Sequence, residues 1–195
     1  MRVVAICGSL RKASCNMGML RHCKDFLSSK GTTLDIISTD ILGALPLLNM
    51  DTHELHQKGA IVQEFYQSLS QADAFLFATC EYNGSISAPL KNAIDWGSIC
   101  KKGNLWNDKP VAIIGAGGYA GTTRAQGHLR DICHNVNLKS LSGPFGSGLE
   151  VRIQIFQDKP PPFNEAGDVQ SKFCKDELDK CMTGLIDWTN QLQKK

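Results

Sequence analysis

The chain has 195 residues, of which 42% are hydrophobic and 21% are charged, and its net charge is +2 with a sequence pI near 8.1. This composition is that of one globular domain and excludes an intrinsically disordered chain. The nearly balanced charge also argues against a dedicated nucleic-acid binder and against the strongly acidic surface of a small electron carrier.

Targeting signals and metal-binding patterns are missing from the sequence. No apolar run approaches the roughly 18 residues that span a bilayer. The first expected strand begins at about residue 2, which leaves no room for a signal or transit peptide, so we expect a cytoplasmic protein. Eight cysteines are present without a Cys-x-x-Cys pair or a zinc-type cluster with histidine. We therefore expect reduced thiols and no metal site.

The first predicted elements are a strand, a small polar loop and a helix. Residues 3–7 form a short apolar run that a glycine ends, which is typical of a strand buried on both faces. Apolar residues at three- and four-residue intervals from Met17 to Leu27 predict a helix. A loop between a strand and a helix N-terminus suits a phosphate, because free N–H groups and the positive end of the helix dipole point to one place.

The side chains of loop 8–16 fit the same hypothesis. Ser9, Ser14 and Asn16 offer neutral donors, and Arg11 offers a forked cation suited to phosphate oxygens. Two alternatives stay open at this point. Asn16 could be only a helix N-cap, and the loop could be an ordinary strand-to-helix turn.

The rest of the chain alternates between apolar runs and helical periodicities. Further strands are expected at residues 33–37, 73–79, 110–115 and 138–141. Helices are expected at about 61–69, 90–96, 123–135 and 174–192, with a loop to about residue 52 and an irregular excursion at 143–167. Five strands alternating with helices predict one domain over residues 1–195. It is an α/β three-layer sandwich, with a five-stranded parallel sheet covered by helices on both faces.

Such sheets bind ligands beyond the carboxyl ends of their strands. Loops 8–16, 80–88 and 115–122 meet that condition, and all are rich in glycine and small polar residues. The last of them also fits the G-x-G-x-x-A dinucleotide fingerprint. That fingerprint belongs in the first strand-to-helix turn, with an acidic residue about 20 positions later, and residues 135–137 contain no acid. We therefore interpret it as a glycine loop that passes close to a flat ligand.

Several motifs together resemble the NADPH-dependent FMN reductase family. They are Gly8-Ser9-Leu10-Arg11 with Ser14 and Asn16, Glu81-Tyr82-Asn83-Gly84-Ser85-Ile86, the helix from Leu90 to Trp96, the glycine loop with Arg124 and His128, and residues 162–167. The family has a flavodoxin-like fold and includes NAD(P)H:quinone reductases and related azo-dye and chromate reductases. One departure is Cys80, which stands where the family usually has proline.

The resemblance implies a function and a site. It implies an FMN-dependent NAD(P)H oxidoreductase that works by a ping-pong mechanism, with NADPH or NADH as donor and a quinone, azo dye or chromate as acceptor. The flavin carries the chemistry, so no catalytic side chain is expected. The implied cofactor-binding residues are Ser9, Arg11, Ser14, Asn16, Glu81, Tyr82, Asn83, Gly84, Ser85, Gly117 and Gly118.

Further expectations concern single positions of the site. Glu81 is expected to be a structural partner of backbone amides, and Tyr82 to line the flavin edge or pack its own loop. His128 is expected near the open flavin face or as a surface histidine. By resemblance, helix 90–96 helps to form a homodimer or homotetramer, so its apolar residues could be interface.

Three alternative functions stay open on the sequence. One is a reductase that releases free reduced FMN, and another is a non-enzymatic flavodoxin-like electron carrier. The third is a phosphate-binding regulatory module without flavin. The physiological acceptor and the choice between NADPH and NADH are also open.

Overall fold

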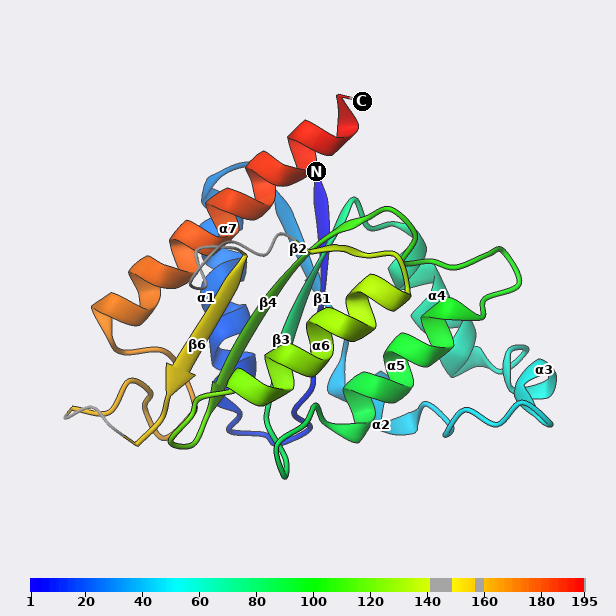
Figure 1. Cartoon of the computed structure of the whole chain (residues 1–195), viewed down its shortest axis with the longest axis horizontal. Coiled ribbons are helices and arrows are strands. Elements are labelled where there is room, and N and C mark those ends of the chain that lie inside the picture. Colours follow the sequence, from blue (N-terminus) through cyan, green and yellow to red (C-terminus); the bar gives the residue numbers. More distant parts are fainter. Residues whose placement is uncertain (141–148, 157–159, 195) are drawn as a thin grey trace.

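A computed structural model describes residues 1–140, 149–156 and 160–194. Its centre is a wholly parallel sheet in the order β2-β1-β3-β4, with both β5 and β6 pairing with β4 (Figure 1). The strands are β1 (Arg2–Cys7), β2 (Thr33–Ile36), β3 (Ala74–Thr79), β4 (Pro110–Gly117), β5 (Lys139–Ser140) and β6 (Glu150–Gln154). The predicted α/β sandwich is confirmed.

In the described residues the sheet has six strands, but β5 and β6 lie on the same side of β4 and together occupy one edge position. β5 pairs with Pro110 and Val111 at the start of β4, and β6 pairs with the rest of β4 up to Gly117. The sequence analysis placed β6 within an irregular excursion, and this prediction is wrong. In β6 only Val151 and Ile153 are buried, so its pattern is the weak alternation of a short edge strand. Of that excursion, residues 143–148 and 157–159 lie outside the described residues, as does residue 141 at the end of the predicted strand 138–141.

Helices cover both faces of the sheet, as predicted (Figure 1). One face carries α1 (Cys15–Ser29) and α7 (Lys172–Gln193), and the other carries α4 (Ala60–Ser70), α5 (Ala88–Ser98) and α6 (Thr123–Asn135). Strand β1 contributes side chains to the hydrophobic cores on both faces of the sheet. Val3 and Ala5 face α1 and α7, whereas Val4 and Ile6 face the other helices.

Two short helices lie between β2 and α4, in a segment for which the sequence predicted no helix. They are α2 (Thr39–Ala44) and α3 (His53–His56). Ser38 caps α2 by accepting a hydrogen bond from the backbone N–H of Asp40, and Leu42 is buried beneath it. These helices are too short for a clear periodicity in the sequence.

Helix α5 differs from expectation in one respect. Its apolar residues, including Leu90, Ile94 and Trp96, are fully buried within this chain rather than presented as an interface. The Trp106 ring packs so closely that a Cβ at Gly97 would lie 2.3 Å from it. Trp106 also donates a hydrogen bond from Nε1 to the carbonyl of Ile94 at 2.8 Å. The helix is therefore fixed against the sheet from inside.

All eight cysteines fall within the described residues and are free thiols, as expected. Among the described residues, no group of histidine, cysteine or acidic side chains is arranged to hold a metal ion. None of the described helices is long and apolar enough to cross a membrane.

Candidate functional site

Three loops meet at the carboxyl edge of the sheet, where β1, β3 and β4 end side by side (Figure 1). They enclose a cavity of about 120 Å³. The lining residues come from all three loops and from the end of β6: Ser9, Arg11, Ser14, Cys15, Asn16, Cys80, Glu81, Tyr82, Ala116, Gly117 and Ile155. The convergence of the three loops is as the sequence predicts.

Ser14 organises the first loop. It is the N-cap of α1, and its Oγ accepts a hydrogen bond from the backbone N–H of Met17 at 3.3 Å. The alternative in which Asn16 is the cap is therefore wrong. No acidic side chain lies in the first turn of α1, so nothing there offsets the positive end of the helix dipole. Ser9 and Ser14 are buried, whereas Arg11 is exposed at the rim.

Asn16 connects two of the loops. Its Nδ2 donates to the carbonyl of Ala116 at 3.1 Å, and its Oδ1 accepts from the N–H of Ala116 at 2.9 Å. A side-chain amide has two donor hydrogens, so one remains for a ligand in the cavity that Asn16 lines. The side chain thus fastens α1 to the end of β4, and its role toward a cofactor stays a prediction.

The second loop contains a tight turn. Tyr82 and Ser85 exchange two backbone hydrogen bonds, of 3.0 and 3.1 Å. Between them, Asn83 and Gly84 have φ angles of 50° and 80°. Positive φ at both central positions is the two-residue hairpin that Asn-Gly favours. The turn is therefore fixed by its own backbone, although Cys80 stands where a rigid proline is usual.

Glu81 holds the second loop to helix α6. Its Oε2 accepts hydrogen bonds from the backbone N–H groups of Arg124 and Ala125, both at 3.0 Å. A carboxylate at a helix N-terminus is stabilised by the free N–H groups and by the dipole. The expectation that Glu81 is a structural partner of backbone amides is confirmed, while a contact to a cofactor stays a prediction.

Tyr82 reaches from the second loop toward the first. Its hydroxyl interacts with Cys80 and Ser9, although the residue as a whole is 52% exposed. Electrostatic repulsion from Cys80, and then partial burial, raise the pKa of Tyr82. The hydroxyl therefore stays protonated at neutral pH and is a hydrogen-bond donor at the mouth of the cavity.

In the third loop, the backbone leaves no room for a side chain at position 117 but leaves room for one at position 118. A Cβ at Gly117 would lie 2.2 Å from the carbonyl oxygen of Gly121. At Gly118 the nearest heavy atom would be Cε2 of Phe156, at 3.9 Å. Gly117 is therefore required by the local backbone, whereas Gly118 leaves an open surface.

A further contact lies at the rim. Ser85 Oγ and His128 Nδ1 lie 3.0 Å apart, which places exposed His128 beside the second loop.

Cys15 lines the cavity near Arg11. Burial raises the pKa of the Cys15 thiol, and the Arg11 charge only partly opposes this effect. The thiol is therefore mostly protonated at neutral pH.

Four lining residues were not among the predicted cofactor-binding residues. Cys15, Cys80 and Ala116 lie in the predicted loops, whereas Ile155 lies outside them. Ile155 follows β6, and its backbone N–H donates to the carbonyl of Gly117 at 2.9 Å. The alternation Val151, Ile153, Ile155 was the available signal. Ala116 has no signal of its own, because its backbone hydrogen bonds are to Asn16, 100 residues away.

A larger cavity lies elsewhere. It has a volume of about 730 Å³ and is formed by α4 and the segments around it. Its lining includes Gln57, Tyr66 and Lys101 and shares no residue with the three loops. It therefore lies away from the strand ends where a sheet of this kind binds its ligand.

Comparisons with known proteins agree on the family. A model of the NADPH-dependent FMN reductase family matches residues 1–149. The chain is 39% identical over 194 residues to an NADPH:quinone oxidoreductase of Arabidopsis thaliana, covering 100% of this chain and 94% of the relative. It is 35% identical over 193 residues to an NAD(P)H-dependent FMN reductase of Pseudomonas aeruginosa, covering 98% and 97%.

Solved structures agree on the fold. FerB, a flavoenzyme NAD(P)H:(acceptor) oxidoreductase from Paracoccus denitrificans, is similar with a TM-score of 0.80 and 27% identity over 97% of each chain. An archaeal flavodoxin is similar with a TM-score of 0.58 at 11% identity, covering 99% of each chain. The second likeness concerns the flavodoxin-like fold alone.

Proposed function

The chain belongs to the NADPH-dependent FMN reductase family, and from this premise we propose that it binds FMN and transfers electrons from NAD(P)H to a quinone-like acceptor. The observation that carries the proposal is the cavity of three loops at the carboxyl edge of the sheet. It combines two buried serine hydroxyls, the Arg11 cation and the N-terminus of α1.

This donor set fits the phosphate end of FMN. Phosphate oxygens accept hydrogen bonds from hydroxyls, from backbone N–H groups at a helix start and from a guanidinium. A cavity of about 120 Å³ is below the roughly 300 Å³ of sites that enclose a whole drug-sized ligand. It therefore accommodates the phosphate end and leaves the ring at the open rim. We assign Ser9, Arg11, Ser14 and Asn16 to the phosphate end.

The other two loops suit a flat ring. Gly84 and Gly118 carry no side chain of their own at the rim, and the turn at Asn83 presents peptide groups at the same rim. Backbone N–H groups there would stabilise negative charge that develops at the pyrimidine edge of the ring. We assign residues 82–85 and 117–118 to this end.

Bound FMN supplies the redox chemistry by accepting a hydride equivalent from the nicotinamide and giving two electrons to the acceptor. The protein binds and orients the reactants and needs no titrating side chain for this purpose. Glu81 is engaged with backbone amides, and Tyr82 is held protonated, so neither is available as a base. We infer a ping-pong sequence in which NAD(P)H and the acceptor occupy the same open face in turn.

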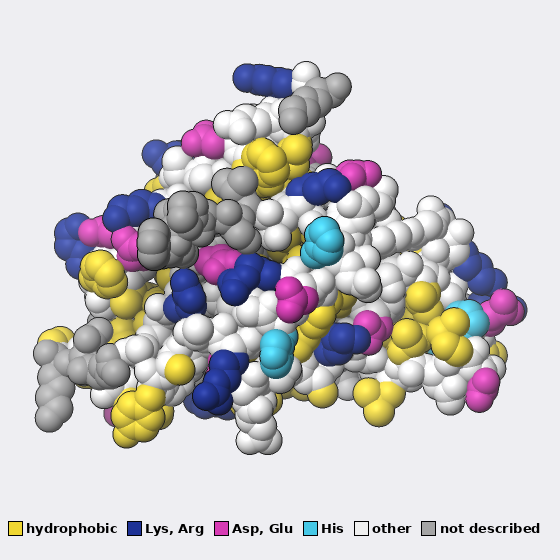
Figure 2. All heavy atoms as spheres, in the orientation of Figure 1, with side chains coloured by type: hydrophobic (Ala, Val, Ile, Leu, Met, Phe, Trp, Pro, Cys, Tyr) yellow, Lys and Arg dark blue, Asp and Glu magenta, His cyan; other side chains and the backbone are white. Residues whose placement is uncertain are grey.

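A homo-oligomer is a further part of the proposal. Leu47, Met50 and Leu55 are 78%, 60% and 71% exposed. Hydrophobic side chains gather over α3 in Figure 2. Apolar patches of this kind mark protein interfaces. We propose that a second copy of this chain covers them, and analytical ultracentrifugation with and without a Leu47→Glu, Leu55→Glu double substitution tests this.

The decisive experiment is an absorbance spectrum of the purified protein after FMN loading and dialysis. Retained flavin bands that bleach with anaerobic NADPH and return with a quinone support both half-reactions. Flavin lost on dialysis would favour the reductase that releases reduced FMN. A protein that binds no flavin would overturn the proposal and favour a phosphate-binding module.

A further inference from the structure

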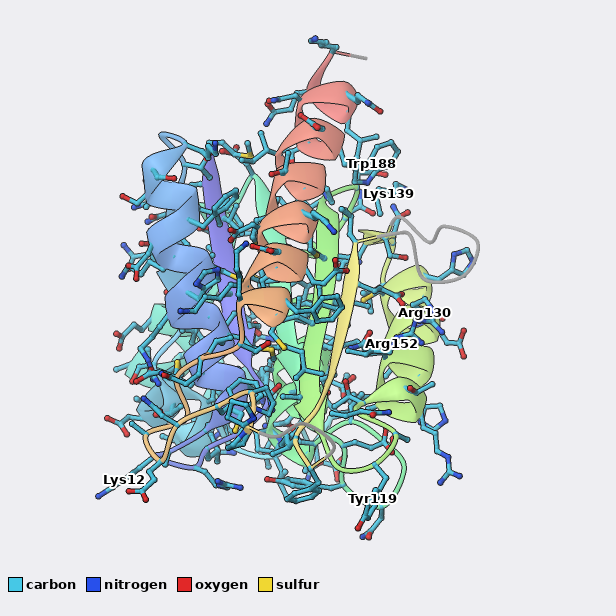
Figure 3. The ribbon with its side chains drawn as sticks, turned by 90° about the vertical axis from the view of Figure 1, so that its left-hand side faces the viewer. Lys12, Tyr119, Arg130, Lys139, Arg152 and Trp188 are labelled. Atoms are coloured by element: carbon cyan, nitrogen blue, oxygen red, sulfur yellow. The ribbon has the colours of Figure 1, made fainter. Side chains whose placement is uncertain are left out.

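Two exposed aromatic rings lie side by side at the rim of the site. Tyr119 follows β4 and Phe156 follows β6, and their ring centroids are 6.1 Å apart with the planes tilted by 51°. The residues are 79% and 68% exposed. Figure 3 shows Tyr119 projecting from the carboxyl edge of the sheet.

The pair is attached to the loop that lines the cavity. The hydrogen bond from Ile155 N–H to the carbonyl of Gly117 continues the β4–β6 pairing. Ile155 immediately precedes Phe156, and Gly117 is two residues before Tyr119. Gly117 and Ile155 also line the cavity itself. Phe156 lies over Gly118, since a Cβ there would be 3.9 Å from its ring. The rings therefore stand next to the predicted flavin position rather than at a remote surface.

Exposed apolar side chains are concentrated around this rim. Of the eight large hydrophobic residues that are exposed in the described part of the chain, three belong to the loops of the site and a fourth follows β6 beside them. These are Leu10, Tyr82, Tyr119 and Phe156. Exposed apolar side chains at the rim of a polar cavity are typical of a ligand-binding surface.

We propose that Tyr119 and Phe156 form an aromatic shelf that binds the planar ring of the electron acceptor. Electron-rich aromatic faces attract flat, electron-poor rings such as quinones, and they discriminate against acceptors without a flat face. The shelf thus selects the acceptor class. This inference rests on the proposed function, because it needs an acceptor to be reduced at this site.

The test compares a flat acceptor with a non-planar one on the FMN-loaded enzyme. Tyr119→Leu and Phe156→Leu keep an apolar side chain and remove the ring. With 2-methyl-1,4-naphthoquinone at saturating NADPH, we expect KM to rise about threefold for each variant and about tenfold for the double variant. With ferricyanide, an octahedral complex, KM should not change. Phe173→Leu is the matched control, because Phe173 is 71% exposed on α7.

A binding measurement without turnover accompanies the kinetics. Isothermal titration of 1,8-naphthalimide, a flat and electron-poor probe that NADPH does not reduce, into the oxidised enzyme should show the same weakening in the double variant and none in Phe173→Leu. Unchanged KM for the quinone and unchanged 1,8-naphthalimide affinity would overturn the shelf. An equal rise in KM for ferricyanide, a rise confined to the KM for NADPH, or a weaker FMN affinity would also overturn it. A wild-type protein without flavin or NADPH oxidation would contradict the proposed function instead.

Discussion

The side-chain amide of Asn16 forms two hydrogen bonds with the backbone of Ala116, across a separation of 100 residues. Asn16 is 4% exposed, and it joins the first turn of α1 to the end of β4. The two sides of the cavity are therefore held at a fixed separation before any ligand binds.

Replacing Asn16 by alanine should destabilise the protein by about 2–4 kcal/mol, because it leaves a buried N–H and C=O of Ala116 unpaired. Urea unfolding of the flavin-free protein measures this change. Asn190→Ala, on the exposed face of α7, is the control and should have little effect. Equal stability of Asn16→Ala and the control would show that the hydrogen bonds between Asn16 and Ala116 do not stabilise the folded protein.

Glu81 gives a second prediction, since its carboxylate caps α6. Glu81→Ala should lower the free energy of unfolding by about 1–2 kcal/mol. Glu81→Gln keeps an acceptor oxygen and should retain most of the stability, and both variants should still oxidise NADPH when loaded with FMN. Thermal unfolding and NADPH oxidation check this. Loss of turnover in Glu81→Gln without loss of stability would mean that the charge acts in the reaction.

The sequence was sufficient for the parts of the site whose signals are local. The both-face burial of β1 and the apolar β3 and β4 predicted the parallel sheet, and the glycine-rich loops at their ends predicted which loops converge around a cavity. Asn83-Gly84 is also local, because the turn needs positive φ at these two residues alone.

The parts that were missed depend on contacts between distant residues. Nothing near Asn16 indicates that its amide bonds to Ala116, so its sequence context suggested a ligand donor or a cap. The family resemblance suggested an interface at the apolar positions of α5, and helical periodicity alone does not tell which surface covers them. Only the structure shows that residues of this chain, Trp106 among them, cover the apolar side of α5.

A substitution at Gly84 can distinguish a loss of stability through backbone strain from a loss of FMN binding. Gly84→Val places a branched side chain at φ +80°, beside Arg124, on the face assigned to the flavin ring. Gly31→Val is the matched control, because Gly31 has φ +69° and open space around it. Both variants should lose about 1–2 kcal/mol of stability. Only Gly84→Val should lose FMN affinity, measured by fluorescence titration, and equal FMN affinity in the two variants would reject this placement.

Buried thiols predict a loss of stability at high pH. Burial raises the pKa of Cys23 and Cys133, and it raises that of Cys181 from 9.0 to about 12. The folded state therefore keeps these thiols protonated while the unfolded chain ionises them above pH 9. Their stabilising contribution is complete below pH 9 and is lost as the pH rises from 9 toward 12. Urea unfolding at pH 7, 9 and 10.5 should show this fall, and Cys181→Ala should make it shallower. An identical pH slope in that variant would contradict the prediction.

Arg11 should bind the phosphate of FMN, since its side chain lines the cavity and its guanidinium suits phosphate oxygens. Arg11→Ala should weaken FMN binding by about tenfold, because a hydrogen bond to a charged group contributes about 1.5–3 kcal/mol and this side chain is partly screened at the surface. Lys12→Ala removes the same charge from the next position, where Figure 3 shows the side chain pointing away from the fold. Fluorescence titration with FMN and with riboflavin, which lacks the phosphate, tests the assignment. Arg11→Ala should lose affinity for FMN and not for riboflavin, while Lys12→Ala should retain both. If the two variants weaken FMN binding equally, Arg11 contributes only general positive charge and does not contact the phosphate.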